Sequence, residues 1–88
     1  MSITEGVVVA VNRNRGMVAV WVEQRGGHTI IEMLSSHEIQ PGDKILWATG
    51  TSMGSNPYTN ATQGWSTEVY VQNHDVSKAN LRAQLLIN

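Results

Sequence analysis

The sequence predicts an all-β fold, a five-stranded barrel with a short helix near the C-terminal end. Five stretches show an apolar pattern with a period of two and are rich in β-branched residues. Glycine, proline and asparagine gather between these stretches, where turns are expected. A chain of 88 residues is long enough for one such domain, so we expect a single unit over residues 1–88.

The first three strands are expected to form a meander. The valine-rich GVVVAV predicts a strand over residues 6–11, and MVAVWVE and HTIIEML predict strands over 17–23 and 28–34. Gly26 and Gly27 can adopt positive φ angles, so they predict a two-residue hairpin turn between the second and third strands. With that turn, Val20 lies opposite Met33.

Strand pleating then divides these residues between two faces. A tight turn at Arg13-Asn14 adds the first strand to the same scheme. The predicted core face carries Val7, Val9, Val11, Val18, Val20, Val22, Thr29, Ile31 and Met33. The predicted outer face carries Val8, Ala10, Met17, Ala19, Trp21, Glu23, Ile30 and Glu32.

The second half of the chain has fewer apolar runs. The Pro41-Gly42-Asp43 turn introduces a fourth strand over residues 44–48, and STEVYVQ predicts a fifth over 66–72. Residues 49–65 are dominated by Gly, Ser, Thr, Asn and Pro, which predicts one long loop. Asp75 or Ser77 can cap a helix over about 76–86.

The opening hairpin resembles the cold-shock and S1-like branch of the OB-fold. The strand GVVVAV is followed by Asn12, the basic Arg15 and Gly16, and MLSS and PGDKI fall where that family ends its third strand and begins its fourth. The resemblance covers about the first half of the chain and implies an OB-like barrel that binds single-stranded nucleic acid. An SH3-like barrel, which also has five strands, is the alternative architecture.

The chain departs from the cold-shock pattern on the face that would bind bases. Ala10, Met17 and Ala19 stand where the stacking aromatic residues of the family align, and Glu23 and Glu32 share that face. With a formal net charge of −1, the chain is expected to bind nucleic acid only weakly and without selectivity. The residues available for such binding are Arg13, Arg15 and Arg25 in the hairpin turns, with Tyr58 and Trp65 in or beside the long loop.

The outer face is too apolar to be left in water, which favours a protein-interaction module. On a helical wheel, Val76, Ala79, Ala83, Leu86 and Ile87 share one side of the C-terminal helix, whereas Leu81 and Leu85 point the other way. One side is expected to dock on the barrel and the other on a protein partner, in the simplest case a second copy of the chain. The predicted interface therefore comprises Met17, Trp21, Ile30, Leu81 and Leu85.

Other classes of function find no support in the sequence. His28, His37 and His74 have no metal-ligand spacing, and no nucleophile or phosphate-loop motif is present. We therefore expect no catalytic residues, metal or cofactor. The chain has no cysteine and no apolar run long enough for a membrane span, and its first residues lack the basic region of a signal peptide. A cytoplasmic protein is expected.

Overall fold

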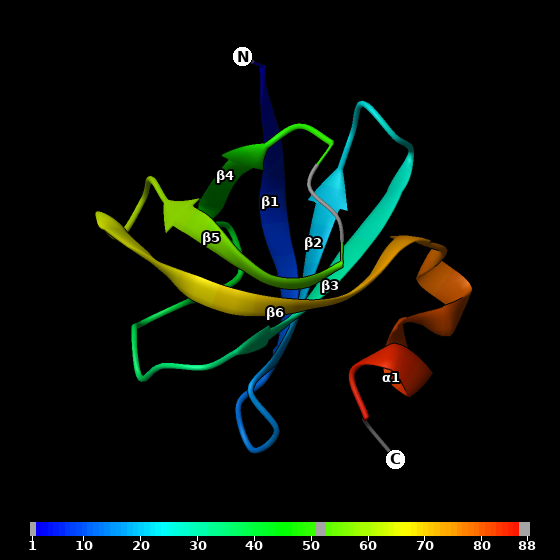
Figure 1. The fold of residues 1–88 in the computed structure, drawn as a ribbon. Coiled ribbons are helices and arrows are strands. Elements are labelled where there is room, and N and C mark those ends of the chain that lie inside the picture. The colour runs from blue at the N-terminus through cyan, green and yellow to red at the C-terminus, as the bar shows by residue number, and fades with distance from the viewer. Residues whose placement is uncertain (1, 51–52, 87–88) are drawn as a thin grey trace.

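The computed structural model describes residues 2–50 and 53–86 and shows a closed β-barrel (Figure 1). The strands are β1 (Ile3–Asn12), β2 (Met17–Val22), β3 (Gly27–Met33), β4 (Lys44–Ala48), β5 (Gly54–Asn60) and β6 (Trp65–Val76). They follow one another around the barrel in the order β1-β2-β3-β6-β5-β4, and each neighbouring pair is antiparallel. The all-β class, the barrel and the short C-terminal helix are confirmed, but the described residues form six strands and not five.

The additional strand is β5, which lies inside the segment predicted to be one long loop, residues 49–65. That prediction is wrong: β5 pairs with β6 from Gly54 opposite Val71 to Asn60 opposite Trp65. The inward residues near its end are Tyr58 and Asn60, so the strand alternates without the apolar pattern that identifies a strand in sequence. An even number of strands also lets a closed ring be antiparallel throughout, whereas a ring of five requires one parallel pair.

The β2–β3 turn is longer than predicted. Trp21 pairs with His28 and Val22 with Gly27, so Val20 faces Thr29 and not Met33. Gly26 adopts a φ of 65° in the turn, whereas Gly27 belongs to β3. The predicted register is wrong, but the error is an even number of residues, so each side chain keeps its predicted face. The inner cluster accordingly contains Val18, Val20, Val22 and Ile31.

A β-bulge in β1 explains a second error. The pairing with β2 shifts between Val8 and Ala10, so side chains before the bulge alternate in the opposite phase from those after it. Val11 packs against the inner cluster as predicted, but Val8 occupies the core in place of Val7 and Val9. The predicted core position of those two valines is therefore wrong.

The barrel interior is filled by side chains from all six strands and from the β3–β4 connection. The rings of Trp47 and Tyr58 stack with their centroids 4.6 Å apart and their planes 3° from parallel. Gly6 makes room for this pair, since a side chain at that position would meet Val20, the Trp21 carbonyl oxygen and the Trp47 ring. The inner cluster comprises Val8, Val18, Val20, Val22, Ile31, Ile39, Ile45, Trp47, Tyr58, Val69 and Val71.

The C-terminal tail folds back beside the barrel (Figure 1). Strand β6 continues to Val76, beyond the predicted end at residue 72, because Val76 still pairs with His28 of β3. A 3-10 turn η1 (Lys78–Asn80) and a single-turn helix α1 (Leu81–Gln84) follow. The predicted helix over residues 76–86 is thus reduced to its middle part, and Leu86 leaves the helix with a φ of 61°.

Candidate functional site

The tail covers the outer apolar face that was predicted to bind a partner. Leu85 is 1% exposed and belongs to a second apolar cluster with Met17, Ala19, Ile30 and Val76. Leu81 packs against the same cluster, and the Asn12 side-chain amide donates to the Leu85 carbonyl oxygen at 2.7 Å. Four of the predicted interface residues, Met17, Ile30, Leu81 and Leu85, therefore bury one another within one chain.

The assignment of Leu81 and Leu85 to a partner is wrong for a geometric reason. A helical wheel that starts at Val76 assumes 100° per residue throughout, but Val76 lies in a strand and residues 78–80 form a 3-10 turn. The phase of the helix is therefore reset before Leu81. As a result Leu85 points to the barrel and Leu86, which was assigned to the docking side, is 50% exposed.

A different apolar surface remains open, and we call it the β1 patch: Ile3, Val7, Val9, Trp21 and Leu46. Ile3, Val7 and Val9 are 54%, 39% and 43% exposed. Trp21 lies opposite Val7 on β2 and is half-buried, while Leu46 lies opposite Glu5 on β4. A hollow of about 520 Å³ lies between Trp21 and the outward side chains of β1, and its lining also includes the polar residues Glu5, Glu23 and Gln24. Trp21 is thus the one predicted interface residue that belongs to an open surface of the described chain.

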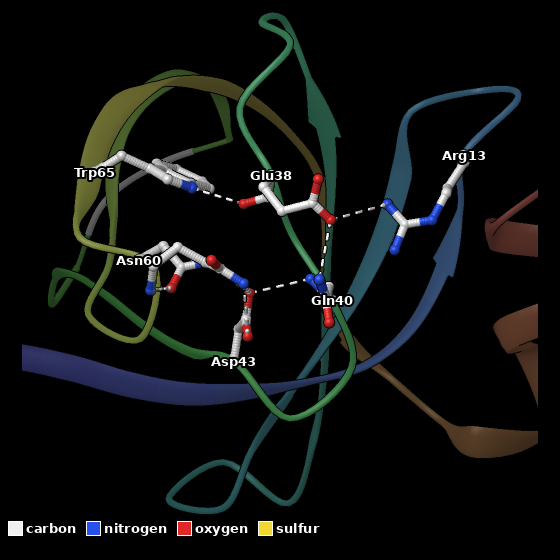
Figure 2. A network of polar contacts seen from close by, with 7 residues as sticks. Arg13, Glu38, Gln40, Asp43, Asn60 and Trp65 are labelled. Atoms are coloured by element: carbon white, nitrogen blue, oxygen red, sulfur yellow. Dashed lines mark hydrogen bonds and ion pairs between the residues drawn. The ribbon is translucent and has the colours of Figure 1, made fainter.

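A buried polar network fixes the β3–β4 connection to the β5–β6 hairpin (Figure 2). Asp43 is 4% exposed, and its carboxylate accepts from the Gln40 backbone N–H at 3.0 Å and from the Asn60 side-chain amide at 2.8 Å. The Gln63 side chain donates to the same carboxylate at 3.2 Å, and the Asn60 side-chain oxygen Oδ1 accepts from the Gln63 backbone N–H at 2.8 Å. The contacts of Asp43 with Asn60 and Gln63 join segments 17 and 20 residues apart in sequence, so the network acts as an internal brace.

Glu38 lies between Arg13 and Trp65 at one end of the barrel (Figure 2). The Trp65 indole N–H donates to the Glu38 backbone carbonyl at 2.6 Å, and Gln40 Nε2 donates to Glu38 Oε1 at 3.1 Å. Arg13 Nη1 lies 3.9 Å from the same Oε1. The His37 ring packs on Trp65 with a centroid distance of 5.1 Å. Two other parts of the chain therefore contact Glu38: Trp65 at its backbone carbonyl and Arg13 at its carboxylate.

A hollow of about 180 Å³ opens beside Arg13 and Glu38, and we call it the end pocket. It lies between the β1–β2 turn and the first residues after β3. Its lining combines apolar residues with polar ones, namely Val11, Arg13, Gly16, Val18, Met33, Ser35, Ser36, His37, Glu38 and Ile39. Ser35 Oγ and His37 Nδ1 are 2.7 Å apart within this lining.

The opposite end of β2 carries an ion pair of different geometry. Arg25 donates from Nε and Nη2 to the two carboxylate oxygens of Asp75, each at 2.7 Å. This hydrogen bond and charge raise the pKa of Arg25, and the bond from Arg25 lowers the pKa of Asp75. Asp75 has a φ of 57°, and a side chain at Gly27 would come within 3.0 Å of the Asp75 Cα. Gly27 is therefore needed for the close approach of β3 to this strained residue.

Two histidines lie near that ion pair, and a ring nitrogen of each makes a hydrogen bond within the fold. His28 Nδ1 donates to the Val76 carbonyl at 2.8 Å, and His74 Nδ1 is 2.9 Å from Thr29 Oγ1. Burial lowers the pKa of His74, and the positive charge of Arg25 lowers it further. Among residues 2–50 and 53–86, no three His, Asp or Glu side chains come close enough together to hold a metal ion.

The residues predicted to contact nucleic acid do not form one surface. Arg13 and Arg15 lie on the β1–β2 turn and Arg25 on the β2–β3 turn, which is at the other end of β2. Trp65 lies at the same end of the barrel as Arg13, because both residues contact Glu38. Tyr58, in contrast, is 1% exposed and stacks on Trp47 inside the barrel. The prediction that Tyr58 lies in a loop and offers a stacking surface is therefore wrong, because it belongs to the inner face of β5.

The sequence prediction also missed the residues that organise the Arg13 end. Asp43 was recognised only as part of a Pro-Gly-Asp turn, and Asn60 lay inside the supposed loop. Glu38 and His37 lie in an irregular connection that has no periodicity. A turn aspartate next to a strand is the one sequence feature that could have suggested the brace.

The hydroxyl of Tyr58 provides a first test of the interior. This buried oxygen has no hydrogen-bond partner among the described residues, and such a group costs stability. We expect Tyr58→Phe to raise the free energy of unfolding at pH 7 by about 1 kcal/mol in urea titrations. Tyr70→Phe is the matched control because Tyr70 is exposed. A loss of stability in Tyr58→Phe would show that the hydroxyl is bonded.

The same residue predicts a dependence on alkaline pH. Burial raises the pKa of the Tyr58 phenol above its ordinary value. Above pH about 10 the unfolded chain loses this proton while the folded chain keeps it, so stability falls as the pH rises. Urea titrations at pH values between 8 and 11, in steps of about half a pH unit, measure this effect. The free energy of unfolding should fall less with pH in Tyr58→Phe than in the wild type.

A comparison with protein-family models, with curated proteins and with solved structures finds no match to this chain. Within the two described ranges, no helix has both the length and the apolar character needed to cross a bilayer.

Proposed function

We propose that the protein is a non-catalytic interaction module that self-associates through the β1 patch. The observation that carries this proposal is the run of Ile3, Val7 and Val9, each more than a third exposed, along one strand beside Trp21. Apolar side chains gathered on one surface are typical of sites where a protein meets a partner. We also propose the cytoplasm as the compartment, because a chain without cysteine needs no oxidising environment to fold.

The charges around the β1 patch favour a second copy of the chain as the partner. Glu5 lies opposite Leu46 and Lys44 lies opposite Val7, so both charges lie within the patch, and Lys44 Nζ is 3.9 Å from Glu5 Oε1. These two charges offset each other, and Glu23 adds one negative charge at the edge of the hollow. A strongly charged partner gains little from such a surface, whereas an identical apolar surface is complementary to it. Two-fold symmetric pairing through one shared patch is the commonest form of self-association.

Substitution of Val7 tests this proposal. We expect the wild type to form a dimer whose fraction rises with concentration, and Val7→Lys to shift the chain to monomer, because the charge must be desolvated at the centre of the patch. Sedimentation equilibrium measures both. Leu34→Lys is the control, since Leu34 is 55% exposed but lies outside the patch, and it should associate like the wild type.

Two outcomes would contradict self-association through this surface. A wild type that stays monomeric at about 1 mM excludes an affinity that matters in a cell. A Val7→Lys variant that dimerises like the wild type shows that the interface lies elsewhere. Circular dichroism of each variant confirms that the barrel is folded before association is compared.

The alternative function is weak binding of single-stranded nucleic acid at the Arg13 end. It is favoured by the presence of Arg13, Arg15 and the Trp65 ring at one end of the barrel, together with the cold-shock resemblance of the opening hairpin. Glu38 lies between Arg13 and Trp65, and its charge repels phosphate. Few phosphate contacts are available, so we expect oligonucleotide binding to disappear as salt approaches physiological strength. Tight, sequence-selective binding in a fluorescence titration at that salt would favour this alternative.

A further inference from the structure

We propose that the end pocket binds a free α-amino acid with an aliphatic side chain. The pocket has a volume of about 180 Å³, and its lining combines the apolar residues Val11, Val18, Met33 and Ile39 with a positive and a negative side chain, Arg13 and Glu38. These are the three features needed to recognise the side chain, the carboxylate and the ammonium group of such a ligand. This site is separate from the β1 patch and does not depend on self-association.

The interior of the pocket sets the class of side chain. Val11 and Met33 are partly buried against the inner cluster, and the buried Ile39 lies beside them. Gly16 contributes no side chain to the lining. An apolar cavity of about 150 Å³ is large enough for benzene, so a leucine, isoleucine or methionine side chain fits this volume. An alanine side chain would leave most of it unfilled.

The charged pair beside the interior suits the two charges of a zwitterion. Arg13 Nη1 and Glu38 Oε1 are 3.9 Å apart, and the two side chains are 59% and 58% exposed. An exposed pair at this distance contributes little to folding, so little is lost when a ligand separates the two groups. The guanidinium can donate to the ligand carboxylate, and the Glu38 carboxylate can accept from the ligand ammonium.

Glu38 is also held in place before any ligand arrives. The Trp65 indole fixes its backbone carbonyl and Gln40 donates to its carboxylate. Pre-positioned groups reduce the entropy that binding must overcome. Arg13 comes from a turn on the other side of the pocket, so the two charges approach a ligand from different segments of the chain (Figure 2).

The arrangement distinguishes a free amino acid from the end of a peptide. A free amino acid carries its ammonium and carboxylate on one carbon atom, next to the side chain. A peptide terminus has only one of these charges beside its terminal side chain, so it would leave either Arg13 or Glu38 without a ligand partner.

The test is an NMR titration of the full chain with L-leucine. We expect saturable shifts of the Gly16, Met33 and Ile39 amide signals, with half-saturation at about 1 mM. N-acetyl-leucine lacks the ammonium charge, leucinamide lacks the carboxylate and L-alanine lacks the long side chain. Each of these three is expected to bind at least about five-fold more weakly than L-leucine.

Charge-removing variants assign each ligand group to its residue. Arg13→Gln should weaken L-leucine at least about five-fold but leave leucinamide unchanged, because leucinamide has no carboxylate to lose. Glu38→Gln should weaken L-leucine similarly but leave N-acetyl-leucine unchanged. Lys78→Gln and Glu23→Gln remove one charge of each sign outside the pocket lining, and they should bind L-leucine like the wild type.

Several results would overturn the proposal. Linear, non-saturating shifts with L-leucine would show that the pocket does not bind it. Equal affinity for L-leucine and N-acetyl-leucine would indicate recognition of a peptide C-terminus instead. Unchanged L-leucine affinity in a folded Arg13→Gln or Glu38→Gln variant would show that the charged pair does not contact the ligand.

Discussion

Replacing Asp43 by alanine should lower the free energy of unfolding by about 4 kcal/mol, the largest effect that we expect from a single substitution. The Asp43 carboxylate is buried and accepts from Gln40, Asn60 and Gln63. Removing it leaves these donors without their acceptor, and the fully buried Asn60 amide has little access to water. Equilibrium urea unfolding, followed by tryptophan fluorescence, measures the loss.

A matched control and a double-mutant cycle define the origin of that loss. Glu68→Ala removes an exposed carboxylate that accepts from Ser55, and it should change stability by less than about 1 kcal/mol. Asn60→Ala alone should also be destabilising, but the double variant should lose less than the sum of the two single losses. Additive losses, or a loss below about 1 kcal/mol for Asp43→Ala, would contradict the role of the network as a brace.

The second large effect concerns two adjacent leucines of the tail. Leu85→Ala should lower the free energy of unfolding by about 3 kcal/mol, because it creates a cavity among Met17, Ala19 and Ile30. Leu86→Ala is the natural control, since Leu86 is half exposed, and it should change stability by less than about 0.5 kcal/mol. Thermal and urea unfolding of the two variants provide the comparison.

The same pair of variants decides between a tail that is docked and a tail that is free to bind a partner. If Leu85 served a partner, Leu85→Ala would alter association and leave the unfolding of the isolated chain unchanged. With Leu85 in the second cluster, hydrogen exchange in Leu85→Ala should accelerate at the amides of the tail and of the strands beneath it. Unchanged exchange and unchanged stability would contradict the docked position.

The parts of the fold that the sequence predicted correctly depend on apolar alternation. Valine or isoleucine occupies the inner positions 18, 20, 22 and 31 of strands β2 and β3, so their inner faces could be predicted even though the turn between them is longer than predicted. The β5 strand could not be predicted in this way because its inward residues include the polar Asn60. The Asn60 amide donates to Asp43, which lies 17 residues earlier in the sequence. Such a contact becomes visible only when the two segments are placed together.

Local irregularities account for the other differences. The bulge after Val8 reverses the inward and outward positions of the first half of β1, and no residue in a run of valines marks where it falls. The phase of the tail depends on where β6 ends, which is set by pairing with β3. The candidate sites depend on these same features, because the bulge exposes Val7 and Val9 and the irregular segment after β3 supplies Glu38.

The closed ring of strands has a consequence for how this protein can meet a partner. In an open sheet, the outermost strands offer unpaired peptide N–H and C=O groups, on which another chain can add a strand or begin to aggregate. Here β1 pairs with both β2 and β4, and the ring returns to its start. A partner must therefore be recognised by side chains on the outer surface of the barrel. An assembly can then form or dissociate while the main-chain hydrogen bonds of the barrel stay in place.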